Sequence, residues 1–246
     1  MFPYKDDNPR SGPAVITVAL VAFNVLVWVF VEGLGTGSAL PQAVCTFGIV
    51  PGALTGHLAP GASVTLGEGY TCVLGSAPSW VTPLTSMFIH GSWFHLIGNM
   101  WFLWLFGDNV EAAMGHARYA LFYLVTGLAA VAAQVLGDPH ATVPMVGASG
   151  AISGVMGAYL VLYPRARVHL LVFLGIFITR VAVPAYVMLG YWFLLQVLGS
   201  SVGALQGEGG VAYLAHVGGF VAGAALVLLL RNRTFQTPRD RLLMKT

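Results

Sequence analysis

Charged side chains are scarce in this sequence: its 246 residues include eleven Lys and Arg and nine Asp and Glu, or 8% of the chain. A typical soluble globular protein carries about 25% charged residues. So few charges cannot cover the surface of a water-soluble protein of this length, which excludes a cytosolic enzyme and a disordered protein. The formal net charge of +2 leaves no basic surface for a nucleic acid. Because 57% of the residues are hydrophobic, the sequence predicts an integral membrane protein.

Six apolar segments are long enough to cross the membrane as helices, which takes about 20 residues for a hydrocarbon layer of roughly 30 Å. The predicted spans cover residues 14–34, 87–106, 117–136, 145–163, 181–198 and 211–230. The apolar stretch 168–179 is too short to span and is expected at the membrane interface. The predicted fold class is therefore an all-α membrane protein, a six-transmembrane-helix bundle that forms a single membrane domain over residues 1–246.

The eleven cations indicate how these spans are oriented. With six spans, both termini and the connections near residues 107–117 and 164–180 fall on one side, and every Lys and Arg lies there or within a residue or two of it. By the positive-inside rule this side is the cytoplasm. We therefore expect an integral protein of a bacterial plasma membrane, with both termini cytoplasmic and a basic cytoplasmic tail at residues 231–246.

The longest connection, residues 35–85, is an outer loop between the first two predicted spans. A loop of this length usually has a function and packing of its own. The only two cysteines, Cys45 and Cys72, both lie in it, on the oxidising side of the membrane. A disulfide is permitted there, and two free thiols are the alternative because spacing alone cannot prove a bridge.

A few polar residues lie inside the apolar spans, where their burial is costly and usually functional. Measured from the cytoplasmic span ends at 1.5 Å per residue, Ser149 lies about 24 Å deep, His216 about 22 Å and His95 about 20 Å. Three side chains on three helices thus share one level in the outer part of the bilayer. A serine beside a histidine makes a nucleophile and a general base. No carboxylate shares this level, so the pattern predicts a dyad whose imidazole is oriented by packing.

Neighbouring residues complete this predicted site. His95 and Asn99 are four residues apart on one helix face, where both side chains can donate to a developing oxyanion. The backbone N–H of Ser149, at a helix start, can add a third donor. Four small residues flank the serine or follow the histidine on its helix face and allow two helices to approach closely: Gly147, Gly150, Gly219 and Gly223.

These motifs together resemble the rhomboid family of intramembrane serine proteases. The matching segments are His90 to Asn99, Gly147 to Gly150, and Ala215 to Gly219 with Gly223, together with Pro184, Trp192 and Gln196 in the fifth span. The resemblance covers roughly residues 47–230. It departs at Ser153, where some family members carry a tyrosine beneath the histidine, and this leaves open what holds the ring of His216.

The resemblance implies a function for each site residue. Ser149 is then the nucleophile, His216 the base, His95 and Asn99 the oxyanion donors, and His90 a neighbour of the water entrance. The implied partners are the lipid bilayer and membrane-protein substrates with a transmembrane helix, cut beside small residues near the outer face. The active site opens to the extracytoplasmic side, and neither a metal nor another cofactor is implied. The sequence leaves the oligomeric state open.

Three other functions remain as alternatives. A transporter or channel would use the His and Asn residues as a polar path, but these residues stop at one depth. A zinc protease would use His90, His95 and His216, but the chain lacks a His-Glu-x-x-His motif. A catalytically inactive rhomboid relative would act as a binding protein, although serine, histidine and both donors are present.

Overall fold

Six long helices form the body of the computed structural model, which describes residues 2–8, 12–66, 70–75, 79–175, 177–206 and 211–232. They are α1 (Val15–Phe30), α5 (Trp93–Met114), α6 (His116–Gly137), α7 (Ser149–Leu162), α8 (Ala185–Gln206) and α9 (Tyr213–Leu230). Each helix overlaps one of the predicted spans. Within the described part of the chain, α6 and α9 are long and apolar enough to cross a membrane, whereas α1, α7 and the first part of α8 are apolar but shorter.

The second predicted span, residues 87–106, is displaced, because α5 begins later and ends later than predicted. Gly107, which was expected to end the span, lies inside the helix. A Cβ atom on this glycine would lie 2.8 Å from the hydroxyl of Tyr119 in α6 and 2.9 Å from the methyl group of Thr17 in α1. Gly107 therefore permits a close contact among three helices, which is a common use of glycine in helix bundles.

Two small antiparallel sheets show that the all-α prediction is wrong in part. Strands β1 (Phe2–Asp6), β4 (Arg167–Leu174) and β5 (Phe177–Pro184) form one sheet, in the order β1-β4-β5. The short apolar stretch 168–179 thus pairs its backbone groups in a hairpin. The fifth helix consequently begins at Ala185, not at residue 181 as predicted, and the chain returns to the bundle through a hydrogen bond from Ala185 N–H to the carbonyl of Ala166 (2.8 Å).

The outer loop has the packing of its own that its length predicted. It contains the short helices α2 (Ala39–Phe47), α3 (Pro51–Leu54) and α4 (Thr82–Thr85), the 3-10 turns η1 (Gly33–Gly35) and η3 (Ser86–Phe88), and the paired strands β2 (Ser63–Leu66) and β3 (Tyr70–Val73). A disulfide joins Cys45 in α2 to Cys72 in β3, with 5.5 Å between their Cα atoms. Two backbone hydrogen bonds between Ile49 and Met145, of 3.1 and 2.7 Å, tie the loop to the segment that leads into α7.

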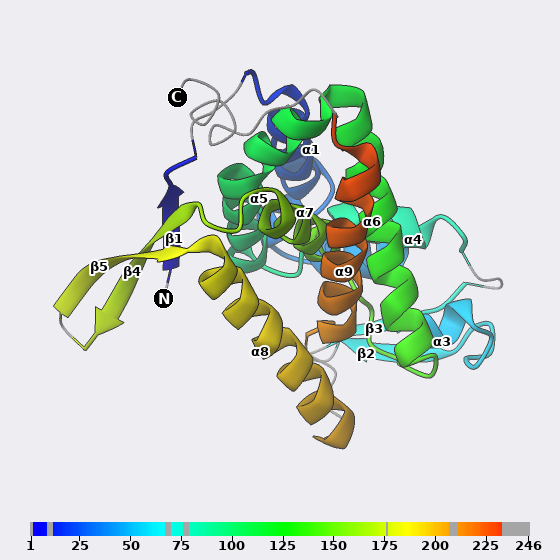
Figure 1. Cartoon of the computed structure of the whole chain (residues 1–246). Helices are drawn as coiled ribbons and strands as arrows, with labels where there is room; N and C mark the ends of the chain where they lie inside the picture. The colour runs from blue at the N-terminus through cyan, green and yellow to red at the C-terminus, as the bar shows by residue number, and fades with distance from the viewer. Residues whose placement is uncertain are drawn as a thin grey trace, which may run out of the picture.

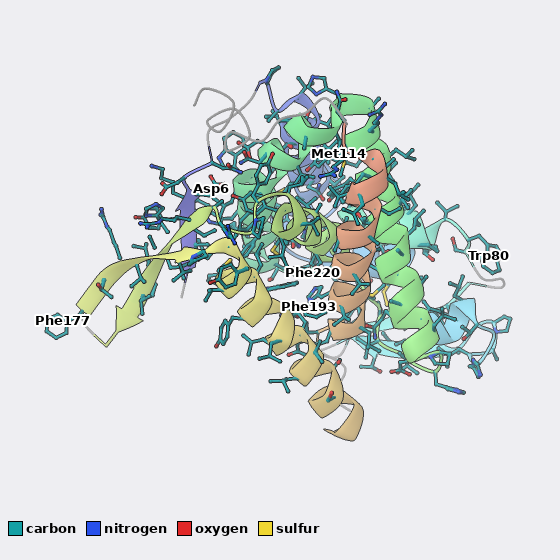
Figure 2. The ribbon with its side chains drawn as sticks, in the orientation of Figure 1. Asp6, Trp80, Met114, Phe177, Phe193 and Phe220 are labelled. Atoms are coloured by element: carbon teal, nitrogen blue, oxygen red, sulfur yellow. A yellow bond between two sulfur atoms is a disulfide. The ribbon has the colours of Figure 1, made fainter. Side chains whose placement is uncertain are left out.

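Helix α7 lies at the centre of the bundle and α8 at its edge. Every residue of α7 from Gly150 to Tyr159 is buried, and α8 diverges from the other helices toward its C-terminal end (Figure 1). Stacked rings fill the contact between α8 and α9, where the ring centroids of Phe193 and Phe220 lie 4.7 Å apart (Figure 2). The centre of the core therefore holds the helix that begins with Ser149.

Asp6 fastens the N-terminal strand β1 to the helices. Its carboxylate accepts hydrogen bonds from the hydroxyl of Tyr159 in α7 and from the side-chain amide of Asn109 in α5. Burial raises the pKa of Asp6 to about 6, the hydrogen bond from Tyr159 lowers it in part, and the nearby charge of Asp108 raises it further. The folded protein therefore favours the protonated form of this carboxyl.

This pKa predicts that the attachment of β1 weakens as the pH rises. The stabilisation is fully present below the ordinary pKa of 3.8 and is lost as the pH rises through about 6. In limited proteolysis followed by mass spectrometry, we expect the wild-type strand to be cut faster at pH 8 than at pH 5. Asp6→Asn keeps an acceptor for Tyr159 without a charge and should be cut at similar rates at both pH values. An equally steep pH dependence in Asp6→Asn would contradict the assignment.

Candidate active site

Ser149 and His216 lie in direct contact although 67 residues separate them. Ser149 begins α7, His216 lies in the first turn of α9, and the serine Oγ is 2.8 Å from the imidazole Nε2. Glycine makes this distance possible, since a Cβ atom on Gly219 would lie 2.1 Å from the carbonyl oxygen of Gly150. Gly223 is equally close to the backbone of α7 one turn later. The two helices therefore touch backbone to backbone immediately beside the Ser–His pair.

Gln196 of α8 binds the other nitrogen of the histidine. Its Oε1 lies 2.7 Å from His216 Nδ1, and its Nε2 donates to the carbonyl of Trp192 at 3.4 Å. Because an amide oxygen only accepts, Nδ1 of His216 carries the proton and Nε2 is free to accept one from Ser149. The ring of Trp192 also packs near the imidazole, with 5.8 Å between the ring centroids.

These contacts correct the prediction that packing alone orients the imidazole. Trp192 supplies packing, and Gln196 adds a directional hydrogen bond. Ser153 lies at the position where some relatives carry a tyrosine. It is buried, and its hydroxyl donates to the backbone carbonyl of Ser149 at 2.6 Å, not to His216. Gln196 was noted in the sequence without a role, yet a glutamine in an otherwise apolar span is the kind of signal that selected the other site residues.

His95 presents a ring N–H to the serine. Its Nδ1 accepts a hydrogen bond from the backbone N–H of Gly91 at 3.3 Å, so its Nε2 carries the proton. That Nε2 lies beside Gly147, where a Cβ atom would be only 2.7 Å from it and 3.6 Å from the Oγ of Ser149. Gly147 also has a φ of +126°, which side chains rarely tolerate. The absent side chain of Gly147 thus leaves a space that both the imidazole of His95 and the hydroxyl of Ser149 border.

Asn99, one turn after His95 on α5, supplies a second donor. Its side chain is only 7% exposed, and its Nδ2 has no hydrogen-bond partner within the described structure. Buried donors are nearly always paired, so this unpaired N–H is available to a group bound at the site. The backbone N–H of Ser149 is a third donor, since the first N–H groups of a helix have no partner inside it.

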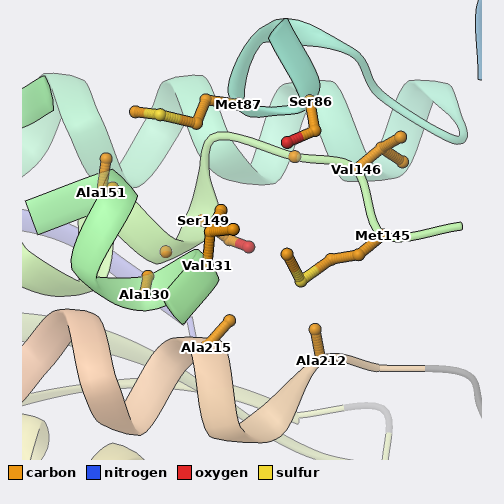
Figure 3. A pocket seen from close by; sticks show the side chains of 13 residues that line it. Ser86, Met87, Ala130, Val131, Met145, Val146, Ser149, Ala151, Ala212 and Ala215 are labelled. Atoms are coloured by element: carbon orange, nitrogen blue, oxygen red, sulfur yellow. The ribbon is translucent and has the colours of Figure 1, made fainter. Parts of the chain in front are cut away.

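A small cavity lies in front of Ser149. Its volume is about 20 Å³, room for about one water molecule. The hydroxyl of Ser149 points into the space bounded by Ser86, Met145 and Ala215 (Figure 3). Glycine and alanine form most of the remaining wall, so only a small group fits beside the serine.

His90, which the resemblance implies is a neighbour of the water entrance, packs beside His95. It is completely buried, and its ring lies 5.2 Å from the ring of His95. Its backbone N–H donates to the carboxylate of Glu32 at 2.6 Å. Glu32 is likewise buried, so a carboxylate does approach this region, but it bonds to the backbone of His90 and not to His216. Within the described residues, no group of three His, Cys, Asp or Glu side chains is placed to hold a metal ion.

Comparison with known proteins adds an independent line of evidence. The chain is 28% identical to the rhomboid protease GluP of Bacillus subtilis over 219 residues. This aligned region covers 89% of the present chain and 36% of GluP. The chain is 30% identical over 151 residues to the mitochondrial Rhomboid protein 1 of Saccharomyces cerevisiae (59% and 40%). It is 32% identical over 157 residues to the chloroplastic Rhomboid-like protein 11 of Arabidopsis thaliana (62% and 53%). The chain thus spans about a third to a half of the length of these relatives.

The family match covers the whole candidate site. A model of the Rhomboid domain matches residues 77–233, more than half of the chain. This range includes Ser149, His216 and Gln196, as well as His95 and Asn99. The chain belongs to the rhomboid family.

Proposed function

We propose that this protein is an intramembrane serine endopeptidase that cleaves transmembrane segments of membrane-protein substrates near the outer face of the bilayer. The observation that carries the proposal is the 2.8 Å contact between Ser149 Oγ and His216 Nε2. The tautomer that Gln196 selects leaves this nitrogen free to act as a base. The names of the relatives support a protease of the rhomboid type.

The proposed topology has six spans, cytoplasmic termini and an active site that opens to the extracytoplasmic side. The supporting observation is the segregation of all Lys and Arg to one side of the six predicted spans. The outer loop also joins the segment just before α7 through Ile49 and Met145, which puts Ser149 at the end of the bundle nearest that loop. The proposed location is the bacterial plasma membrane, with residues 1–246 as one membrane domain.

The reaction follows from the placement of donors and acceptors around Ser149. His216 Nε2 takes the proton of the hydroxyl as Oγ attacks the scissile carbonyl carbon, and negative charge develops on the carbonyl oxygen. The N–H groups of His95, Asn99 and the Ser149 backbone stabilise that charge. The histidine then passes its proton to the leaving amine, which leaves an acyl-enzyme. A water molecule, deprotonated by the same nitrogen, hydrolyses the acyl-enzyme and restores the serine.

The surroundings of the serine indicate what it cleaves. A peptide bond inside a transmembrane helix is hydrogen-bonded within that helix, so the helix must unwind before its carbonyl reaches Ser149. The cavity of about 20 Å³ then favours small side chains beside the scissile bond. We therefore propose substrates with a transmembrane helix that is easily unwound near its outer end and carries small residues there.

Labelling with a fluorophosphonate probe tests the Ser–His pair. We expect Ser149→Ala and His216→Ala to abolish labelling of the purified protein, because the first removes the nucleophile and the second its base. Ser153→Ala is the matched control and should label like wild type, since its hydroxyl lies on the same helix and bonds only to backbone. Equal labelling of all variants would refute the proposed function, and loss of proteolytic activity upon metal chelation would favour the zinc-protease alternative.

Loss of one oxyanion donor should slow turnover without abolishing it. For Asn99→Ala we expect kcat on a fluorogenic transmembrane substrate in vesicles to fall by about 10²–10³, with little change in KM, because the donor acts on charge that develops during the reaction. Asn24 is a matched control, since it is also buried and bonds only to the backbone of its own helix α1. Unchanged turnover in Asn99→Ala would remove this residue from the site.

Gln196 is proposed as the residue that positions His216. Gln196→Met keeps the size of the side chain but removes the acceptor, and should lower kcat about tenfold, the usual effect of one hydrogen bond. Gln196→Glu keeps an acceptor oxygen and should restore much of that loss. KM should change little in either variant. Equal loss in both variants at equal thermal stability would show that Gln196 contributes only packing.

A further inference from the structure

The β4–β5 hairpin carries an exposed apolar surface that the proposed reaction does not use. Figure 1 shows the hairpin reaching sideways out of the helix bundle, away from α6 and α9. Beyond Leu171, the last residue that pairs with β1, strand β4 pairs only with β5 in the described structure, and its other edge is open. Its outer half exposes large apolar side chains: Phe173 (57%), Phe177 (71%), Ile178 (64%) and Val181 (41%).

The two faces of the hairpin differ in chemistry. Side chains alternate along a strand, and paired residues share a face. Val168 and Leu170 are buried against the bundle, so their partners Val183 and Val181, and Phe177 farther out, lie on that same face. With the exception of Thr179, the described side chains of this face are apolar. It therefore continues the protein core outward as an apolar strip that only Thr179 interrupts among the described side chains.

The opposite face carries the cations, with Phe173 and Ile178 farther out on the same face. Arg167 directly precedes the buried Val168 but points away from the core, and Arg180 pairs with Leu171 on the arginine face. Both arginines are exposed, as is Arg165 just before β4. Among the described residues, none of the three has a carboxylate within ion-pair distance. The outer end of the hairpin thus exposes apolar side chains on both faces, and its arginines lie on one face nearer the bundle and at its base.

The position of the hairpin indicates which partner covers it. It is joined directly to α8, whose first turns expose Tyr186, Val187 and Tyr191 toward the surroundings of the bundle. The apolar strip of the hairpin continues that membrane-facing surface. Tyrosine and arginine next to an apolar surface are typical of the membrane–water interface. The outer edge of β5 is unpaired in the described sheet, which hydrocarbon would not tolerate, so this element fits the headgroup level and no deeper.

We propose that the β4–β5 hairpin lies in the cytoplasmic membrane interface, with its apolar outer end toward the acyl chains and its arginines on the headgroups of anionic lipids. Each arginine near an anionic surface favours such lipids about fivefold. The hairpin thereby fixes the cytoplasmic end of α8 at one depth. This inference depends on the proposed orientation of the spans and is independent of catalysis by Ser149.

Lipid quenching of a fluorophore tests this placement. The two native cysteines are bridged, so Phe177→Cys provides a single thiol for an environment-sensitive dye such as NBD. In vesicles of phosphatidylcholine and phosphatidylglycerol, we expect blue-shifted emission and strong quenching by lipids with brominated acyl chains. Lys5→Cys, on the exposed side of β1, is the matched control and should show little quenching. Size-exclusion chromatography and circular dichroism verify that both labelled proteins are folded.

The charge contribution is tested by comparing brominated phosphatidylglycerol with brominated phosphatidylcholine. Quenching at position 177 should be stronger with the anionic lipid, and Arg180→Gln should reduce that preference by up to about fivefold. Quenching at position 177 no greater than at position 5 would overturn the proposal. Disulfide cross-linking between two Phe177→Cys chains without lipid quenching would assign the surface to a second copy and overturn it equally. Because none of these measurements uses proteolysis, their outcome is separate from that of the proposed function.

Discussion

The backbone contact between α7 and α9 is the constraint on which the site depends. Gly150 and Gly219 meet where any side chain on Gly219 would collide with the carbonyl of its neighbour. In lipid, helices gain no hydrophobic free energy by associating, so close packing of small residues is the main source of their attraction. The same contact sets the hydrogen bond between Ser149 and His216. Stability and chemical competence therefore rest on one interface.

The helices around this interface each contribute one kind of group. Helix α5 brings His95 and Asn99, α7 brings Ser149, α9 brings His216 and α8 brings the amide of Gln196. An apolar interior with few competing polar groups makes each hydrogen bond strong and leaves an unpaired donor costly. The unpaired Nδ2 of Asn99 is such a cost, and in the proposed reaction it would be compensated when charge develops on a bound carbonyl.

The sequence predicted much of the site because its signals are strong against an apolar background. Depth along three spans brought Ser149, His216 and His95 to one level, and glycine spacing predicted the close contact. The hairpin was missed because a short apolar run is compatible with a strand or an interfacial segment, and only pairing over long distances distinguishes them. Gln196 was given no role because its contact with His216 depends on how α8 is rotated about its axis. A helix that is apolar on every side shows no pattern from which this rotation can be predicted.

The helices that form the site are not all packed equally well into the bundle. Three of its four helices form the packed centre, whereas α8 diverges from them toward its C-terminal end (Figure 1). An outward movement of α8 would carry Gln196 away from His216 and remove the hydrogen bond to Nδ1 of the imidazole. In the proposed protease, the position of α8 would then affect the reactivity of Ser149 through this hydrogen bond to His216 and not through any contact with the serine itself.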